Sequence, residues 1–169
     1  MKPCESWLGE RQALGCGLAR DVLRSFGRLR LSATGWSMLP TIWPGDTLII
    51  ESACGDSVSK GEIVLFASDQ RLFAHRVIRK IQDAGVWTRG DAMDRPDPFI
   101  ANCNLLGRVV CIEHDGRSRP PKSTVPVLKL AIAALVRRSH LVARVVVRVH
   151  ELFLRFNRSN DGRVIPCQN

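Results

Sequence analysis

A chain of 169 residues, with 45% hydrophobic and 24% charged residues, has the composition of a globular protein and excludes an intrinsically disordered chain. Its length leaves room for one domain with appendages. The net charge of +9 lies in the flanks, because residues 1–30 carry +3, residues 125–169 carry +6 and residues 31–124 are balanced. A nucleic-acid-binding domain usually carries its basic patch on the folded body, so this distribution predicts no nucleic-acid partner and fits peripheral contact with an anionic membrane.

No stretch of the sequence predicts a membrane span or a secretory signal peptide. The longest uninterrupted apolar run covers residues 130–136, whereas a transmembrane helix needs about 20 apolar residues. The N-terminus carries Glu5, Glu10 and Asp21 and lacks the apolar stretch of a signal peptide. These features predict a cytoplasmic or peripheral membrane location.

The six cysteines show no C-x-x-C pair, and no histidine stands at the spacing of a metal site. The sequence therefore predicts neither a metal nor a cofactor. We interpret the cysteines as six separate thiols in a reducing compartment. A disulfide between Cys103 and Cys111 is the alternative.

Residues 1–30 place apolar side chains at near-helical spacing between charged ones, which predicts an N-terminal amphipathic helical segment. Residues 31–116 contain short runs rich in Ile, Val, Leu, Phe and Thr, each bounded by turn residues. The expected strands are residues 47–51, 62–67, 71–81, 85–88 and 105–113. Several short strands at this spacing indicate a mainly β fold built as an antiparallel β-domain.

Residues 117–126 are predicted to form a linker, because Pro120, Pro121 and Pro126 fall within a short stretch. Residues 127–169 are predicted to form a basic helical segment and a tail. Apolar positions there alternate with Lys and Arg at helical spacing, which fits either contact with anionic lipid or packing on the β-domain.

The strongest chemical signal lies in the β-domain. Residues 35–41 have the sequence GWSMLPT, and the turn residues 44–46, PGD, follow them. A strand-like stretch then carries His75, and the acidic residues Asp91 and Asp97 come after it. A serine, a histidine and nearby carboxylates are the parts that an activated serine nucleophile needs.

The order of these motifs resembles signal peptidase I and its relatives in the S24/S26-type superfamily, which include the self-cleaving repressors of the DNA-damage response. In that family a Gly-x-Ser-Met-x-Pro-Thr motif presents the nucleophile, and a Pro-Gly-Asp turn begins the next strand. The later motifs are similar to residues 61–64 (GEIV), 75–77 (HRV), 90–91 (GD) and 106–109 (LGRV). The resemblance covers residues 34–112 and implies an antiparallel β peptidase domain.

The resemblance implies that Ser37 is the nucleophile and His75 its general base, as in the branch found in the endoplasmic reticulum, in archaea and in some Gram-positive bacteria. Many bacterial signal peptidases, and the repressors, use a lysine instead. Lysine titrates near about 10.4 and histidine near about 6.5 in model peptides, so a histidine base needs less adjustment to work at neutral pH. By its offset from the Gly-Asp motif, Asp97 is the carboxylate expected to orient His75. Asp91 is the main alternative, and Asp94 or no carboxylate at all are the others.

An extended peptide substrate is expected to lie in a shallow apolar groove. The predicted lining residues are Met38, Pro40, Ile42 and Trp43, with ordinary core packing as the alternative. The bulky Trp36 is expected to narrow the site. The backbone N–H of Ser37 is the expected oxyanion donor. Many signal peptidases have a second donor, a hydroxyl two residues before the nucleophile, where this chain has a glycine.

The resemblance implies a serine endopeptidase of the signal peptidase I type that cleaves a peptide or pre-protein after a small residue. A self-cleaving repressor fits less well, because residues 1–30 are too few for a DNA-binding domain. A catalytically silent relative, which binds peptides or membranes with the same fold, is the remaining alternative.

Overall fold

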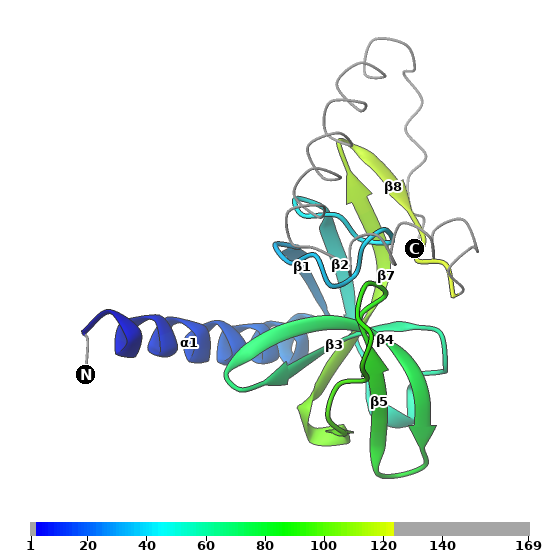
Figure 1. Ribbon diagram of the computed structural model, residues 1–169, viewed down its shortest axis with the longest axis horizontal. Coiled ribbons are helices and arrows are strands. Elements are labelled where there is room, and N and C mark those ends of the chain that lie inside the picture. Colours follow the sequence, from blue (N-terminus) through cyan, green and yellow to red (C-terminus); the bar gives the residue numbers. More distant parts are fainter. Residues whose placement is uncertain (1–2, 124–169) are drawn as a thin grey trace.

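The computed structural model describes residues 3–123, with side chains from residue 12 onward. Helix α1 (Pro3–Phe26) precedes an eight-stranded antiparallel sheet (Figure 1). The strands are β1 (Arg28–Ser32), β2 (Thr47–Ser52), β3 (Ile63–Ser68), β4 (Arg71–Ile81), β5 (Gly85–Arg89), β6 (Ile100–Ala101), β7 (Leu105–His114) and β8 (Arg117–Arg119). The prediction of a mainly β, antiparallel fold with an N-terminal helix is confirmed. The predicted basic helical segment, residues 127–169, lies outside the described residues.

The sheet joins segments that lie far apart in the sequence. Its strand order is β1-β2-β7-β3-β4-β5-β6, and β8 pairs with β7. Both β2 and β3 pair with β7, so a strand late in the domain connects the early ones (Figure 1). Although β7 and β3 lie between β2 and β4 in the sheet, the loop between β1 and β2 and the first half of β4 line one groove.

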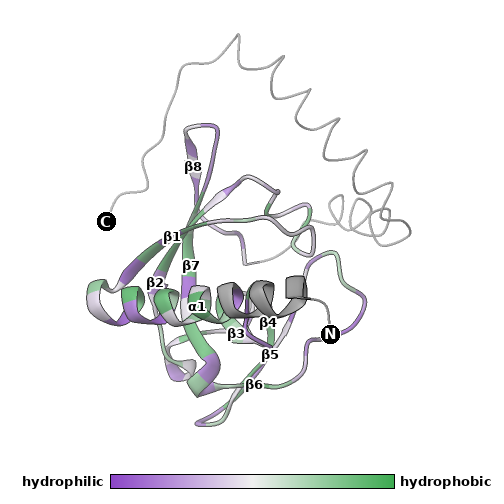
Figure 2. Cartoon of the chain, turned by 90° about the vertical axis from the view of Figure 1, so that its left-hand side faces the viewer, coloured by the Kyte–Doolittle hydropathy of each residue, from purple (hydrophilic) through white to green (hydrophobic). Residues whose placement is uncertain are grey.

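Buried side chains cover both faces of the sheet. On β3, Ile63 and Leu65 belong to one hydrophobic cluster and Val64 and Phe66 to another, as the alternation of side chains along a strand requires. The first cluster includes Leu23 of α1. The helix lies across this face, in contact with β1, β4 and β7 (Figure 2).

The N-terminal helix ends, and the β-domain begins, before the boundary predicted between residues 30 and 31. Helix α1 ends at Phe26, because Gly27 adopts a φ of 70° and donates its N–H to the carbonyl oxygen of Leu23 at 3.0 Å. Strand β1 begins at Arg28, inside the segment predicted to be helical. Its Arg-Leu-Arg-Leu alternation has the period of a strand, which the helical interpretation overlooked.

The linker predicted at residues 117–126 begins instead with β8. Asp115 and Gly116 have φ values of 48° and 76°, the backbone conformation that an Asp-Gly pair favours in a two-residue hairpin turn. The turn pairs His114 with Arg117. The Asp-Gly pair in the sequence indicates this hairpin turn. Because β8 pairs with β7, the β-domain extends past residue 116.

The cysteines do not all remain free. Cys16, Cys54 and Cys103 are free thiols, whereas Cys111 is disulfide-bonded. The interpretation of six separate thiols is therefore wrong at Cys111, and the alternative pairing of Cys103 with Cys111 is wrong because Cys103 is free. Hydrogen bonds with Ser57 lower the pKa of the exposed Cys54 thiol, whereas burial raises the pKa of Cys16.

Candidate active site

Ser37 lies at the start of a tight loop between β1 and β2. The loop closes on itself, because the backbone N–H groups of Thr41 and Ile42 both donate to the carbonyl oxygen of Met38, at 2.8 and 3.0 Å. The side chains of Met38 and Ile42 are buried in the cluster that contains Leu23 of α1. These contacts fix the backbone on the C-terminal side of Ser37.

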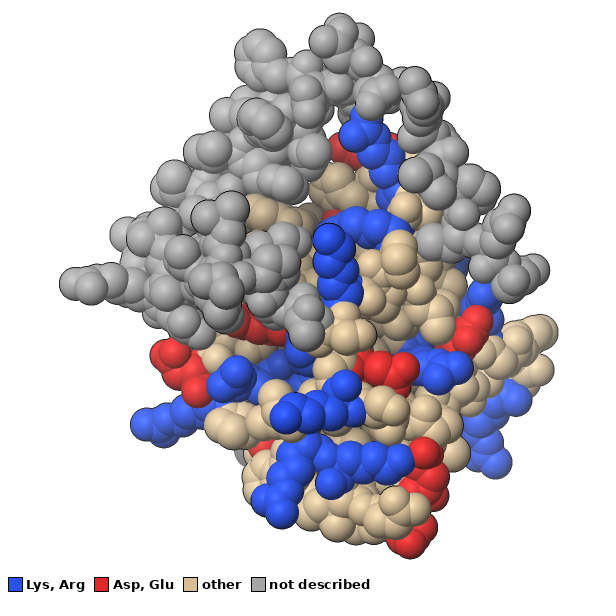
Figure 3. Space-filling model, turned by 90° about the vertical axis from the view of Figure 1, so that its right-hand side faces the viewer, with Lys and Arg blue, Asp and Glu red and all other residues tan. Residues whose placement is uncertain are grey.

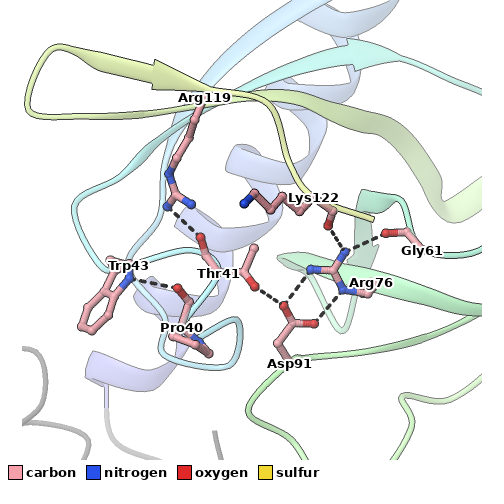
Figure 4. Close-up of polar contacts among 8 residues, drawn as sticks. All are labelled: Pro40, Thr41, Trp43, Gly61, Arg76, Asp91, Arg119 and Lys122. Atoms are coloured by element: carbon pink, nitrogen blue, oxygen red, sulfur yellow. Dashed lines mark hydrogen bonds and ion pairs between the residues drawn. The ribbon is translucent and has the colours of Figure 1, made fainter. Parts of the chain in front are cut away.

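The Pro-Gly-Asp turn supports this loop from its other end. The fully buried Asp46 accepts a hydrogen bond from the backbone N–H of Trp43 at 2.9 Å. Its carboxylate also contacts Nδ1 of His114 and lies 3.5 Å from Nη2 of Arg119. Arg119 donates to the carbonyl oxygen of Thr41 at 2.8 Å (Figure 4). Asp46 thus ties the loop to the β7–β8 hairpin.

His75, on β4, stands between Ser37 and Asp97. Its Nε2 lies 2.8 Å from Oγ of Ser37, and its Nδ1 lies 2.7 Å from Oδ2 of Asp97. The ring is buried and packs against Phe66 and Phe73, with centroid distances of 5.9 and 5.8 Å. A carboxylate accepts only, so in the neutral ring we assign the proton to Nδ1. Nε2 is then free to accept the hydroxyl proton of Ser37.

Thr88 holds Asp97 in place through two hydrogen bonds. The hydroxyl of Thr88 donates to Oδ2 of Asp97 at 2.6 Å, and the backbone N–H of Asp97 donates to the carbonyl oxygen of Thr88 at 2.8 Å. Thr88 is completely buried in β5. The geometry between His75 and Asp97 is therefore set by two paired strands.

Asp91, the alternative partner of His75, is bonded to Arg76 (Figure 4). The guanidinium binds the carboxylate through both oxygens, with Nε to Oδ1 and Nη2 to Oδ2 each at 2.8 Å. The hydroxyl of Thr41 also donates to Asp91, which links this pair to the loop of the serine. Because successive side chains of a strand point to opposite faces, His75 and its neighbour Arg76 select different aspartates.

A groove of about 430 Å³ opens beside Ser37 and His75. Residues 31–35, before the serine, and residues 71–75 of β4 line its length. Met38 and Ile42 line it and also pack in the core, whereas a role in substrate binding stays a prediction. Pro40, Trp36 and Trp43 are not among its lining residues, and the carbonyl oxygen of Pro40 instead accepts the indole N–H of Trp43 at 3.0 Å (Figure 4).

The segment that carries this site matches the model of a known protein family. The family model described as Peptidase S24-like matches residues 18–110, more than half of the chain, and this range includes Ser37, His75 and Asp97. The chain belongs to the Peptidase S24-like family. No curated protein matches it. The expected superfamily is thus confirmed, whereas the signal-peptidase type and the histidine branch remain predictions.

Within this Peptidase S24-like domain, Gly90 packs directly behind the serine. The backbone N–H of Ala92 donates to the carbonyl oxygen of Ser37 at 2.8 Å, which brings the two segments together. A Cβ atom at position 90 would lie only 2.6 Å from that carbonyl oxygen and 3.1 Å from Cβ of Ser37. The Gly-Asp motif therefore needs its glycine because the loop of the serine leaves no space for a side chain.

Gly90→Ala is expected to push the loop of Ser37 out of position. Overpacking of this kind costs about 1–3 kcal/mol in the free energy of unfolding, and a displaced nucleophile costs about 10²-fold in cleavage rate. Urea unfolding and peptide cleavage measure the two effects. Gly35→Ala is the matched control for stability, because a Cβ at Gly35 meets nothing within 4 Å. Equal unfolding free energies for both variants would contradict this packing.

The sequence alone did not single out Arg76, Thr88 or Thr41 as supporting residues. Arg76 directly follows the predicted base His75, and Thr88 lies two residues before Gly90. The alternation of side chains along β4 and β5 was therefore the available signal that these residues lie beside the site.

Among the described side chains, no group of three or more His, Cys, Asp or Glu residues is arranged to hold a metal ion. Within residues 3–123, no helix combines the length and the apolar character that a membrane span requires.

Proposed function

We propose that this Peptidase S24-like domain is a serine endopeptidase of the signal-peptidase type, which cleaves an extended peptide or leader after a small residue. The observation that carries the proposal is the unbroken chain of contacts from Oγ of Ser37 through His75 to Asp97, at 2.8 and 2.7 Å. These distances lie in the range in which a base can take a proton from a nucleophile.

In the proposed mechanism, Oγ of Ser37 attacks the carbonyl carbon of the scissile bond while Nε2 of His75 accepts the hydroxyl proton. Asp97 keeps the ring oriented and stabilises the imidazolium that forms. The imidazolium then gives its proton to the leaving amine, which produces an acyl ester on Ser37. A water molecule hydrolyses this ester, with His75 again as the base. The backbone N–H of Ser37 is the proposed donor to the oxyanion.

The strand edges beside the groove support an extended substrate. Residues 71–75 of β4 pair with β3 along one edge, whereas β5 pairs with β4 only from Arg76 onward. Among residues 3–123, no strand pairs with the other edge of residues 71–75, which lies along the groove. An extended peptide could add to this edge through its main chain, while the apolar lining receives alternate side chains.

A peptide library tests this proposal. The protein is expected to cut extended peptides after small residues such as Ala, because the resemblance implies small side chains on the acyl side of the cut. Mass spectrometry of the products gives the cut sites, and the Ser37→Ala variant controls for contaminating proteases. Cleavage after large aromatic or basic residues, or equal cleavage by the Ser37→Ala variant, would overturn the proposal. Binding of peptides without any cleavage would instead identify a catalytically silent relative.

A further inference from the structure

A row of three side chains runs along one face of β4 and ends at the candidate site. Arg71, Phe73 and His75 are alternate residues of the strand, so they point to the same side. The guanidinium carbon of Arg71 lies 6.0 Å from the ring centroid of Phe73, and the rings of Phe73 and His75 are 5.8 Å apart. The row thus joins a cation at one end to the proposed base at the other.

The β3–β4 turn fixes the position of Arg71. Asp69 and Gln70 have φ values of 48° and 60°, which is the geometry of a two-residue hairpin turn. This turn pairs Ser68 with Arg71 and makes Arg71 the first residue of β4. The guanidinium of Arg71 lies over the ring of Phe73, and the attraction between the cation and the ring favours this position. The turn and the ring of Phe73 therefore both restrict the position of the Arg71 guanidinium.

Arg71 also differs from the other residues of the groove in its charge. The lining is otherwise apolar or neutral apart from the ring of His75. Arg71 is exposed, and no carboxylate among the described residues forms an ion pair with it. A guanidinium without a carboxylate partner among the described residues, in a groove whose other lining residues are uncharged or the ring of His75, is suited to recognise an acidic group on whatever occupies the groove.

We propose that Arg71 determines part of the substrate specificity by binding a Glu or Asp side chain of the substrate. The acidic residue should lie about four residues from the scissile bond, because four residues of an extended strand span about 13 Å, the separation of Arg71 and His75 along β4. The inference rests on the proposed endopeptidase function and narrows its substrates to extended peptides with an acidic residue at that distance.

Peptides that carry Glu, Gln or Lys at each position three to five residues from the cut, on either side, test this proposal. At one position the wild-type protein is expected to prefer Glu over Lys by about fivefold in kcat/KM, as for a partly exposed ion pair. The preference should shrink at high salt. Arg71→Met should abolish it, and Arg71→Glu should reverse it. The preference is taken as the ratio of kcat/KM for the Glu and Lys peptides within each protein, so a change in the overall cleavage rate does not affect it.

Arg79→Glu is the matched control, because Arg79 is an exposed arginine of the same strand that does not line the groove. The control is needed because Lys and Arg side chains are more prominent than Asp and Glu on one face of the molecule (Figure 3). A general attraction of this face for acidic peptides is the competing explanation. An equal loss of preference in Arg79→Glu and Arg71→Glu would overturn the role of Arg71.

The outcomes separate this inference from the proposed function. Cleavage at the expected sites with no change of preference in Arg71→Glu overturns the inference and leaves the endopeptidase standing. If the wild-type protein cuts no peptide, the proposed function fails, and fluorescence anisotropy of labelled peptides still tests the charge recognition. Equal affinity for the Glu and Lys peptides would then overturn the inference as well, whereas a preference that depends on Arg71 supports it.

Discussion

Ser37→Ala is expected to abolish peptide cleavage, and adding His75→Ala to it is expected to cost almost nothing more. Oγ of Ser37 lies 2.8 Å from Nε2 of His75, so in the proposed mechanism the hydroxyl proton passes directly to the ring. A nucleophile without its base, or a base without its nucleophile, fails at the same step. Each single variant should therefore lose at least about 10⁴-fold in kcat, and the double variant should match them.

The measurement is kcat/KM on a peptide that the wild-type protein cuts, for the two single variants and the double variant. Ser59→Ala is the control for the substitution itself, because Ser59 is an exposed serine outside the groove. Losses that add strictly in the double variant would mean that Ser37 and His75 act independently. Full activity in either single variant would falsify the mechanism proposed for this site.

The local pattern of the sequence was enough to predict the longer strands. The segments predicted at residues 71–81 and 105–113 correspond closely to β4 (Arg71–Ile81) and β7 (Leu105–His114). Runs of β-branched and aromatic residues between turn residues carry this information. The two-residue strand β6 was missed because it gives too little pattern to be recognised. Strand β8 was missed although the Asp-Gly pair before it signals a hairpin turn. The pairing of β7 with both β2 and β3 depends on contacts between segments distant in the sequence.

The choice between the two candidate aspartates also depended on tertiary structure. Both Asp91 and Asp97 follow β5, and the spacing of the motif could not exclude either one. The register of β4 with β5 places Arg76 opposite Arg89, which brings Asp91 to the guanidinium of Arg76. Asp97 returns to Thr88 and meets His75 on the other side of the strand. Strand register, which a single sequence does not give, decides the assignment.

Arg76→Met is expected to destabilise the domain by about 3–5 kcal/mol, because it leaves the carboxylate of Asp91 buried without its counter-charge. The side chains of Arg76 and Asp91 are only 9% and 3% exposed. The substitution also removes the donor to the carbonyl oxygens of Gly61 and Lys122, both at 2.7 Å. Stability should therefore fall far more than for an exposed ion pair, which contributes about 0–1 kcal/mol.

A double-mutant cycle measured by urea unfolding tests this expectation. In the double variant, which combines Arg76→Met with Asp91→Leu, no buried charge is left unpaired. It should therefore be more stable than the sum of the single losses predicts, by about 2–3 kcal/mol.

Arg30→Met is the matched control, because the Arg30 side chain forms its 2.6 Å ion pair with Glu113 while it is 67% exposed. That variant should stay within about 1 kcal/mol of the wild type. Strictly additive losses, or a similar loss in Arg30→Met, would mean that Arg76 and Asp91 do not act as a buried pair. Asp91 is also the neighbour in sequence of Gly90, which packs against Ser37. The Arg76→Met variant should therefore cleave peptides more slowly as well, under conditions in which it is still folded.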